Sequence, residues 1–164
     1  MKQERRKHSR LSVIRNVGEP MELDIIQNGK KIEILGFVIN LSAGGVGVVS
    51  LGDQAKDLKA GTTFVLTLTL GDFVCKNVEG KIAHVGLGPK AKLHHTGGEW
   101  MIGLSFTKIK PEYTKHINKM ADDWGICETK MGMKLPDVCF RACTCWDICE
   151  KPVKLSETTP RSRT

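Results

Sequence analysis

A series of short apolar segments separated by tight-turn residues most constrains what this chain can fold into. The series runs from Leu11 to Phe106, with no helical pattern inside it. Segments 21–27 and 31–40 flank the pair Asn28-Gly29. Both residues tolerate the positive φ of a two-residue turn, so this stretch is typical of a β-hairpin.

Further segments repeat the pattern. Thr62–Leu70 reads TTFVLTLTL, with apolar residues alternating with threonine, as expected for a strand with one buried face. Gly71-Asp72 turns this strand into segment 73–85, and Trp100–Phe106 is another short apolar segment. Five or six strands joined by short turns predict an antiparallel barrel or sandwich.

One helix is expected after the strands. Pro111 suits the first helical position, and Gly125 is expected to end the helix. Between them, five apolar residues fall on one face at helical spacing: Tyr113, Ile117, Met120, Ala121 and Trp124. Such a stripe predicts packing against the mouth of a barrel or against a partner.

Length and charge limit the function. The chain has 164 residues, enough for one domain with a tail, and a net charge of +7. The first ten residues carry five positive charges and one negative charge, so +4 of the total lies there. This balance favours an anionic partner such as a nucleotide, a nucleic acid or a membrane surface.

The apolar segments also bear on location. No apolar run approaches the ~20 residues of a membrane span, and no apolar core follows the charged N-terminus. We therefore expect no membrane span and no secretory signal, and a cytoplasmic protein. The expected parts are a basic flexible tail (1–10), a barrel with its helix (11–125), a cysteine-rich extension (126–150) and a disordered tail (151–164).

Two local patterns carry the chemistry. The first is the arginine cluster of the N-terminal tail: Arg5, Arg6 and Arg10. The second is the corner that follows an apolar strand: Asn40, Ser42, Gly44 and Gly45. Guanidinium groups match phosphate oxygens and the O6/N7 edge of guanine, and adjacent glycines let a backbone approach a ligand closely. Taken separately, an arginine run is usually a solvated tail and the corner is usually a plain turn.

Together, in this order and with strands between them, the patterns resemble the PilZ domain family. Arg6-x-x-x-Arg10 matches its RxxxR motif, and Asn40-x-Ser42-x-x-Gly45 matches its [DN]xSxxG motif. Gly103 to Phe106 also resembles the family's late G-x-x-F strand, and the resemblance extends from Glu4 to Trp124.

The resemblance implies a mainly β fold, a six-stranded antiparallel barrel with a C-terminal helix, here followed by the cysteine-rich extension. It implies a bacterial receptor for the second messenger cyclic di-GMP rather than an enzyme. Arg6 and Arg10, helped by Arg5, would hold guanine and phosphate groups. The corner residues would contact the ligand from the barrel, as one molecule or as an intercalated pair. The ordered tail would then present a new surface to a protein partner that the sequence does not name.

The cysteine-rich extension lies outside the resemblance. It contains Cys139, Cys143, Cys145 and Cys149, with Cys127 as an alternate ligand, and thiolates suit Zn²⁺ or an iron–sulfur cluster. On one continuous helix the two cysteine pairs would face apart, so a four-thiolate site needs a bend near 143–145. Packing as small apolar residues, free thiols, and redox or disulfide chemistry remain alternatives.

Two other functions compete with the receptor. A small nucleic-acid-binding barrel would use the basic tail, but the chain has few aromatic residues for base stacking, so nucleic acid is the weaker expectation. An enzyme using the cysteines ranks last, because neither a catalytic triad nor a phosphate-loop fingerprint is present in the sequence.

Overall fold

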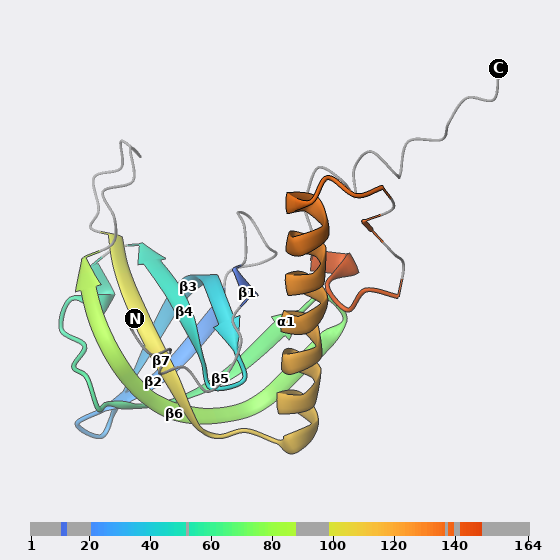
Figure 1. Cartoon of the computed structure of the whole chain (residues 1–164). Helices are drawn as coiled ribbons and strands as arrows, with labels where there is room; N and C mark the ends of the chain where they lie inside the picture. Colours follow the sequence, from blue (N-terminus) through green and yellow to red (C-terminus); the bar gives the residue numbers. More distant parts are fainter. Residues whose placement is uncertain are drawn as a thin grey trace, which may run out of the picture.

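The computed structural model describes residues 11–12, 21–51, 53–87, 99–136, 138–139 and 142–148, and shows a β-barrel beside one long helix (Figure 1). The strands are β1 (Leu11–Ser12), β2 (Met21–Gln27), β3 (Lys30–Ser42), β4 (Gly45–Leu51), β5 (Thr63–Leu70), β6 (Phe73–Leu87) and β7 (Glu99–Lys108). The helices are the short 3-10 turns η1 (Asp53–Ala55) and η2 (Trp146–Ile148) and the α-helix α1 (Pro111–Gly132).

Six of the strands close into an antiparallel barrel. Their order is β3-β2-β5-β6-β7-β4, and a further β3–β4 pairing joins the two ends. Strand β3 makes this closure possible because its first half pairs with β2 and its second half with β4. The short strand β1 lies beside the second half of β3. The predicted six-stranded antiparallel barrel with a C-terminal helix is therefore confirmed.

The turns follow from the residues that occupy them. Asn28 and Gly29 have φ angles of 52° and 73°, and Gln27 pairs with Lys30 across them. These are the positive angles that a two-residue hairpin turn requires. The two-residue turn between β5 and β6 differs, because only its first residue, Gly71 with a φ of 60°, has a positive φ. The hairpin and the turn were both predicted from the sequence.

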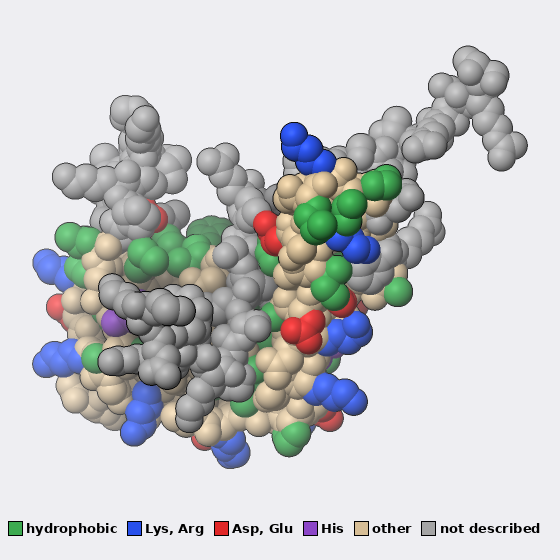
Figure 2. Space-filling view, viewed as in Figure 1, with side chains coloured by type: hydrophobic (Ala, Val, Ile, Leu, Met, Phe, Trp, Pro, Cys, Tyr) green, Lys and Arg blue, Asp and Glu red, His purple; other side chains and the backbone are tan. Residues whose placement is uncertain are grey.

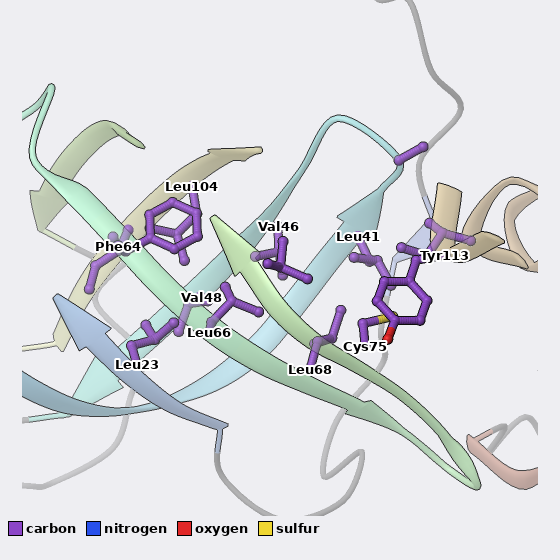
Figure 3. Close-up of a cluster of buried hydrophobic side chains, with 14 of the residues drawn as sticks. Leu23, Leu41, Val46, Val48, Phe64, Leu66, Leu68, Cys75, Leu104 and Tyr113 are labelled. Atoms are coloured by element: carbon purple, nitrogen blue, oxygen red, sulfur yellow. The ribbon is translucent and has the colours of Figure 1, made fainter. Parts of the chain in front are cut away.

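The core fills the inside of the barrel. In β5 the apolar residues Phe64, Leu66 and Leu68 are buried, while the alternating threonines face outward. Figure 3 shows these side chains with others of the core, and places Cys75 and Tyr113 at the end of the barrel where α1 begins. A fully buried side chain of this kind contributes about 1.5–3 kcal/mol.

The apolar stripe of α1 packs as predicted. Its five residues, Tyr113 to Trp124 at helical spacing, are all buried. The Tyr113 hydroxyl accepts a hydrogen bond from the Lys76 backbone N–H (3.4 Å), and the Phe73 ring stacks on His116 with centroids 3.6 Å apart. These contacts join the first turns of the helix to β6.

The predicted end of the helix at Gly125 is wrong, because α1 continues to Gly132. A glycine inside a helix costs only about 1 kcal/mol, which burial of Cys127 on the following turn offsets. The helix ends in a Schellman motif instead. Lys134 adopts a φ of 54°, and the N–H groups of Lys134 and Leu135 donate to the carbonyls of Met131 and Lys130.

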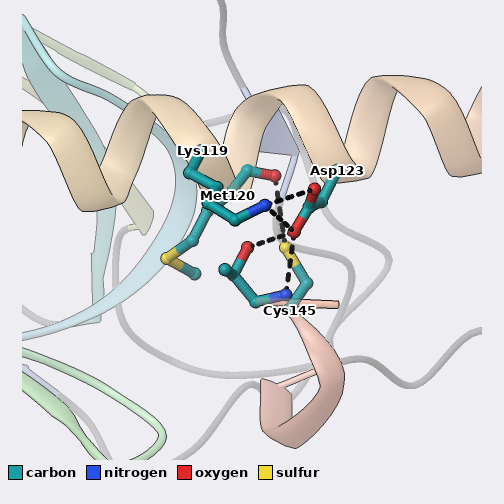
Figure 4. Close-up of polar contacts among 5 residues, drawn as sticks. Lys119, Met120, Asp123 and Cys145 are labelled. Carbon is teal, nitrogen blue, oxygen red and sulfur yellow. Dashed lines mark hydrogen bonds and ion pairs between the residues drawn. The ribbon is translucent and has the colours of Figure 1, made fainter. Parts of the chain in front are cut away.

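The cysteine-rich extension folds back onto α1 at a joint formed by Lys119, Met120, Asp123, Thr144 and Cys145 (Figure 4). The Asp123 carboxylate accepts hydrogen bonds from the Thr144 backbone N–H (2.9 Å) and hydroxyl (2.7 Å). The Cys145 thiol, almost fully buried, donates to the Met120 carbonyl (3.3 Å). Burial acts to raise the pKa of Asp123, but hydrogen bonds from Thr144 and Lys119 outweigh it and lower that pKa.

Candidate functional site

The corner predicted from the sequence, Asn40 to Gly45, lies where β3 turns into β4. Asn40 and Ser42 occupy the last residues of β3, and Gly45 opens β4. The structure therefore brings Asn40, Ser42, Gly44 and Gly45 together within one hairpin. Arg5, Arg6 and Arg10 lie outside the described residues.

Ser42 holds the turn of the corner. Its buried hydroxyl accepts a hydrogen bond from the Gly44 N–H (3.3 Å) and donates one to the Gly45 carbonyl (3.4 Å). The Gly44 carbonyl in turn accepts from the Phe106 N–H of β7 (3.0 Å). The backbone of the corner is thus fixed before any ligand is present.

Gly45 has a structural reason to be glycine. It pairs with Ser105 of β7, and a Cβ at this position would lie only 2.2 Å from the Leu104 carbonyl oxygen. Real Cβ atoms essentially never come so close to another heavy atom, so β4 and β7 would have to part. The glycine permits the close approach of β4 and β7 that seats the corner on the barrel.

Asn40 differs from Ser42 in the state of its side chain, although its backbone belongs to the β3 ladder. It pairs with Gly47, and its amide lies across that glycine, with Nδ2 2.6 Å from where a Cβ would stand. Within the described part of the chain, the amide makes no side-chain hydrogen bond. It therefore retains a donor and an acceptor for a ligand.

Strand β1 brings the N-terminal segment to the corner. Leu11 pairs with Leu41, and Ser12 pairs with Asn40. The backbone that directly follows Arg10 therefore lies beside the polar corner, and α1 contacts both β1 and β3. The sequence did not show this pairing, because two residues carry too little pattern to identify a strand.

Strand pairing places three further residues in line with Asn40. Asn40, Gly47, Gly103 and His84 are consecutive partners in β3, β4, β7 and β6, and we call them the glycine row. Sequence analysis missed Gly47 and His84. Only the strand register places them beside Asn40, and a register shift between Ile82 and His84 hides it from simple alternation.

Positive charge does not gather into one patch among the described residues in view. Figure 2 shows their Lys and Arg side chains dispersed around the barrel and along α1, with acidic side chains between them. Several cations are already paired, for example Lys31 with Asp24 and Glu33, and Lys108 with Glu79. The described residues on this face therefore do not form the continuous basic stripe that a nucleic-acid surface needs.

The titratable groups with shifted pKa values lie away from the corner. Burial raises the pKa of Cys75 to about 11, so this core thiol stays protonated at neutral pH. At the junction of α1 and β6, burial and then the Lys119 charge lower the pKa of His116. Both shifts reflect packing between the barrel and α1.

The predicted metal ligands are only partly described. Cys139, Cys143, Cys145 and Cys127 are in the described part, whereas Cys149 lies outside it. Among the described residues, no three or more His, Cys, Asp or Glu side chains are grouped so that they could hold a metal ion. Binding of Zn²⁺ or an iron–sulfur cluster here stays a prediction that this structure does not support.

An open groove of ≈ 890 Å³ runs along α1 and is lined by residues such as Pro111, Lys115 and Ile126. It includes none of the corner residues.

Among the described residues, no helix has both the length and the apolar character needed to cross a membrane.

Comparison with known proteins identifies the fold. The family model described as PilZ domain matches residues 4–122. The solved PilZ domain of YcgR from Escherichia coli, with c-di-GMP, is similar with a TM-score of 0.55 and 14% identity, over 80% of this chain and 98% of that one. Curated protein sequences give no significant match.

Two longer proteins share the same fold. The K. pneumonia MrkH–c-di-GMP complex has a TM-score of 0.57 and 18% identity, over 79% of this chain and 56% of that one. The Bacillus subtilis inhibitor of motility, MotI/DgrA, has a TM-score of 0.51 and 20% identity, over 73% of this chain and 51% of that one. The chain thus spans about half the length of each.

Proposed function

The chain belongs to the PilZ domain family, and from that premise we propose that it is a receptor for cyclic di-GMP. Two of the similar structures, YcgR and MrkH, contain that ligand. The family match begins at residue 4 and so includes the arginine motif together with the corner. Binding rather than catalysis is the role this family supports, and we assign the chain no enzymatic activity.

The observation that carries the proposal is the pairing of β1 with β3. Leu11 lies opposite Leu41, at the Cα separation of about 4.5–5.5 Å usual for antiparallel partners. Arg10 is bonded to Leu11, so its Cα lies within about 3.8 Å of the Leu11 Cα. Arg6 is five residues from Leu11, a span of at most about 17 Å. Chain connectivity thus keeps both arginines within reach of the corner.

The chemistry of the two segments is complementary to a guanine dinucleotide. Each guanidinium offers paired N–H donors to a phosphate or to the O6/N7 edge of guanine, and charge-assisted bonds of this kind are stronger than neutral ones. Arg6 and Arg10 would form these bonds, with Arg5 as an additional cation. Asn40 would contact a guanine edge, while Ser42, Gly44 and Gly45 hold the backbone against the ligand.

The same geometry supports relay to a protein partner. Helix α1 contacts both β1 and β3, so a ligand that fixes the tail before β1 acts directly beside the helix. Ordering the tail costs conformational entropy, which the charge-assisted bonds to the ligand offset. The ordered tail and the adjacent face of α1 would form the surface that a partner recognises.

Calorimetric titration of the full chain tests the proposal. We expect cyclic di-GMP to bind while GTP and a single-stranded oligonucleotide do not compete at equal concentration. Arg6→Ala and Arg10→Ala should each weaken binding by about a hundredfold, because each removes a charge-assisted bidentate contact. Lys56→Ala, an exposed cation elsewhere on the barrel, is the matched control.

Two results would contradict the receptor assignment. The first is unchanged affinity in both arginine variants, with circular dichroism showing an intact barrel. The second is binding of oligonucleotide and cyclic di-GMP with the same steep salt dependence, which indicates a general polyanion surface instead.

A further inference from the structure

The glycine row lies on the outer face of the barrel, in line with Asn40. Partners in adjacent antiparallel strands project to the same side of a sheet. The residues on either side of Gly47 and Gly103 are buried in the core, which places the row outside: Val46, Val48, Ile102 and Leu104. The row therefore continues the surface of the corner across three further strands.

The two ends of the row lean toward each other over its glycines. At one end, the Asn40 amide covers Gly47. At the other, the His84 imidazole covers Gly103, with Cε1, Nδ1 and Nε2 at 2.1, 2.4 and 2.8 Å from where a Cβ would stand. Three ring atoms so close to one point mean that the ring lies across the glycine rather than beside it.

The spacing of the row suits a planar ligand. Neighbouring strands are about 4.8 Å apart, so the Cα atoms of Asn40 and His84 lie about 14 Å apart, across three spacings. Each side chain leans inward by about one spacing, so about 5 Å separates the amide from the imidazole. The glycines beneath them have no side chain, so the amide and the imidazole can lie against the sheet and a flat group can rest on their outer sides.

The outer side of the His84 ring is available. Its inner side covers Gly103, yet the residue is exposed as a whole. A histidine that served only to cover a glycine would not need to be aligned with Asn40. The imidazole that lies across Gly103 therefore presents the outer side of an aromatic ring to solvent, where a base could stack on it.

We propose that His84 is an additional ligand-contacting residue, whose imidazole stacks against a guanine base of the nucleotide held at the corner. This inference rests on the proposed receptor function and assigns to it a residue that belongs to neither sequence motif. Asn40 and His84 would then approach the ligand from the two ends of the glycine row.

Titration of three His84 variants with cyclic di-GMP separates stacking from other roles. Stacking of a base on an aromatic side chain typically accounts for a five- to hundredfold difference in affinity, so we expect His84→Ala to bind roughly tenfold more weakly. His84→Phe preserves an aromatic face and should stay within about twofold of the parent. His84→Gln preserves hydrogen bonding without an aromatic ring and should resemble the alanine variant. Lys76→Ala, another exposed position on β6, is the control.

A second readout reports the contact itself. In proton–carbon spectra, the His84 ring signals, assigned by their loss in the phenylalanine variant, should move on addition of cyclic di-GMP, because a stacked base shifts the protons beneath it. The His116 signals serve as an internal comparison, since that ring is stacked on Phe73 at the helix.

The outcomes distinguish this inference from the receptor proposal. If Arg10→Ala loses binding while His84→Ala binds like the parent, the role of His84 is overturned and the receptor stands. If His84→Gln binds like the parent and His84→Phe binds more weakly, stacking by the imidazole is overturned. If the parent chain does not bind cyclic di-GMP at all, the receptor proposal fails and this inference fails with it.

Discussion

The corner at Asn40–Gly45 and the joint between α1 and the extension are both polar clusters, but they are built differently. At the joint, the Asp123 carboxylate is buried and accepts two hydrogen bonds from Thr144 and two from Lys119, one at each oxygen for the lysine. At the corner, the Ser42 hydroxyl makes both of its hydrogen bonds within the turn, whereas the Asn40 amide lies over Gly47 and makes no side-chain hydrogen bond among the described residues. A saturated cluster holds segments together, while a rigid cluster with unused donors and acceptors suits a ligand.

Gly45→Ala should break the corner most severely. Its Cβ would meet the Leu104 carbonyl oxygen, which belongs to the backbone and cannot turn aside. We expect a loss of about 1–3 kcal/mol in the free energy of unfolding, together with loss of ligand binding. Chemical denaturation measures the first effect and calorimetry the second. Gly86→Ala is the matched control because no atom lies near its Cβ, and a similar loss in that variant would contradict the explanation.

Asp123→Ala should break the joint and spare the corner. It leaves the Thr144 N–H and hydroxyl without their acceptor, and hydrogen bonds to a charged group contribute about 1.5–3 kcal/mol. We expect thermal unfolding at a lower temperature with unchanged affinity for cyclic di-GMP. The neighbouring exposed Asp122→Ala should do neither. Loss of binding in Asp123→Ala would show that the two regions are not independent.

Gly103→Ala tests whether the position of the His84 ring matters for ligand binding, separately from the stability of the corner. A Cβ here would occupy the place of the His84 ring, which is the end of a side chain and can swing away. The fold should therefore persist, while affinity for cyclic di-GMP falls several-fold, as in His84→Ala. A calorimetric result equal to that of the parent would mean that the ring position does not matter for binding.

Acid should weaken the joint in a predictable direction. The pKa of Asp123 is lowered from 3.8, because hydrogen bonds from Thr144 and Lys119 outweigh the effect of burial. Its contribution to stability is therefore fully present above the unfolded value and is lost as the pH falls through the lower folded value. The difference in stability between the parent and Asp123→Ala should be constant above pH ~5 and shrink below pH ~4. A difference that grows on acidification would reverse the assigned sign.

Local patterns predicted much of the fold, but register and long-range contacts did not follow from them. Asn28-Gly29 and the alternation in Thr62–Leu70 are local signals, and the structure confirms both the hairpin and the buried face. The glycine at 125 was misread because its cost in a helix is small beside the burial that continues at Cys127. Docking of Thr144 on Asp123 joins residues 21 positions apart, which no periodicity reveals.

The candidate site likewise contains residues that the local sequence placed together and one that only the strand register places there. Its motif residues at 40–45 are consecutive, so the sequence was sufficient to place them together. His84 is 44 positions from Asn40 and joins it only through the pairings of four strands. Gly45 illustrates a further lesson, because the motif assigned it to the ligand while the structure shows that β4 and β7 need it for their own contact.

Titration followed by nuclear magnetic resonance tests most directly whether the tail and the corner hold one ligand. Cyclic di-GMP is added to the labelled full chain while the arginine Nε–H signals and the backbone amides of residues 40–45 are recorded together. The account predicts that signals of Arg6 and Arg10 move with those of the corner and yield a single dissociation constant. Movement of the corner with the arginine signals unchanged, or of the arginines alone, would contradict it.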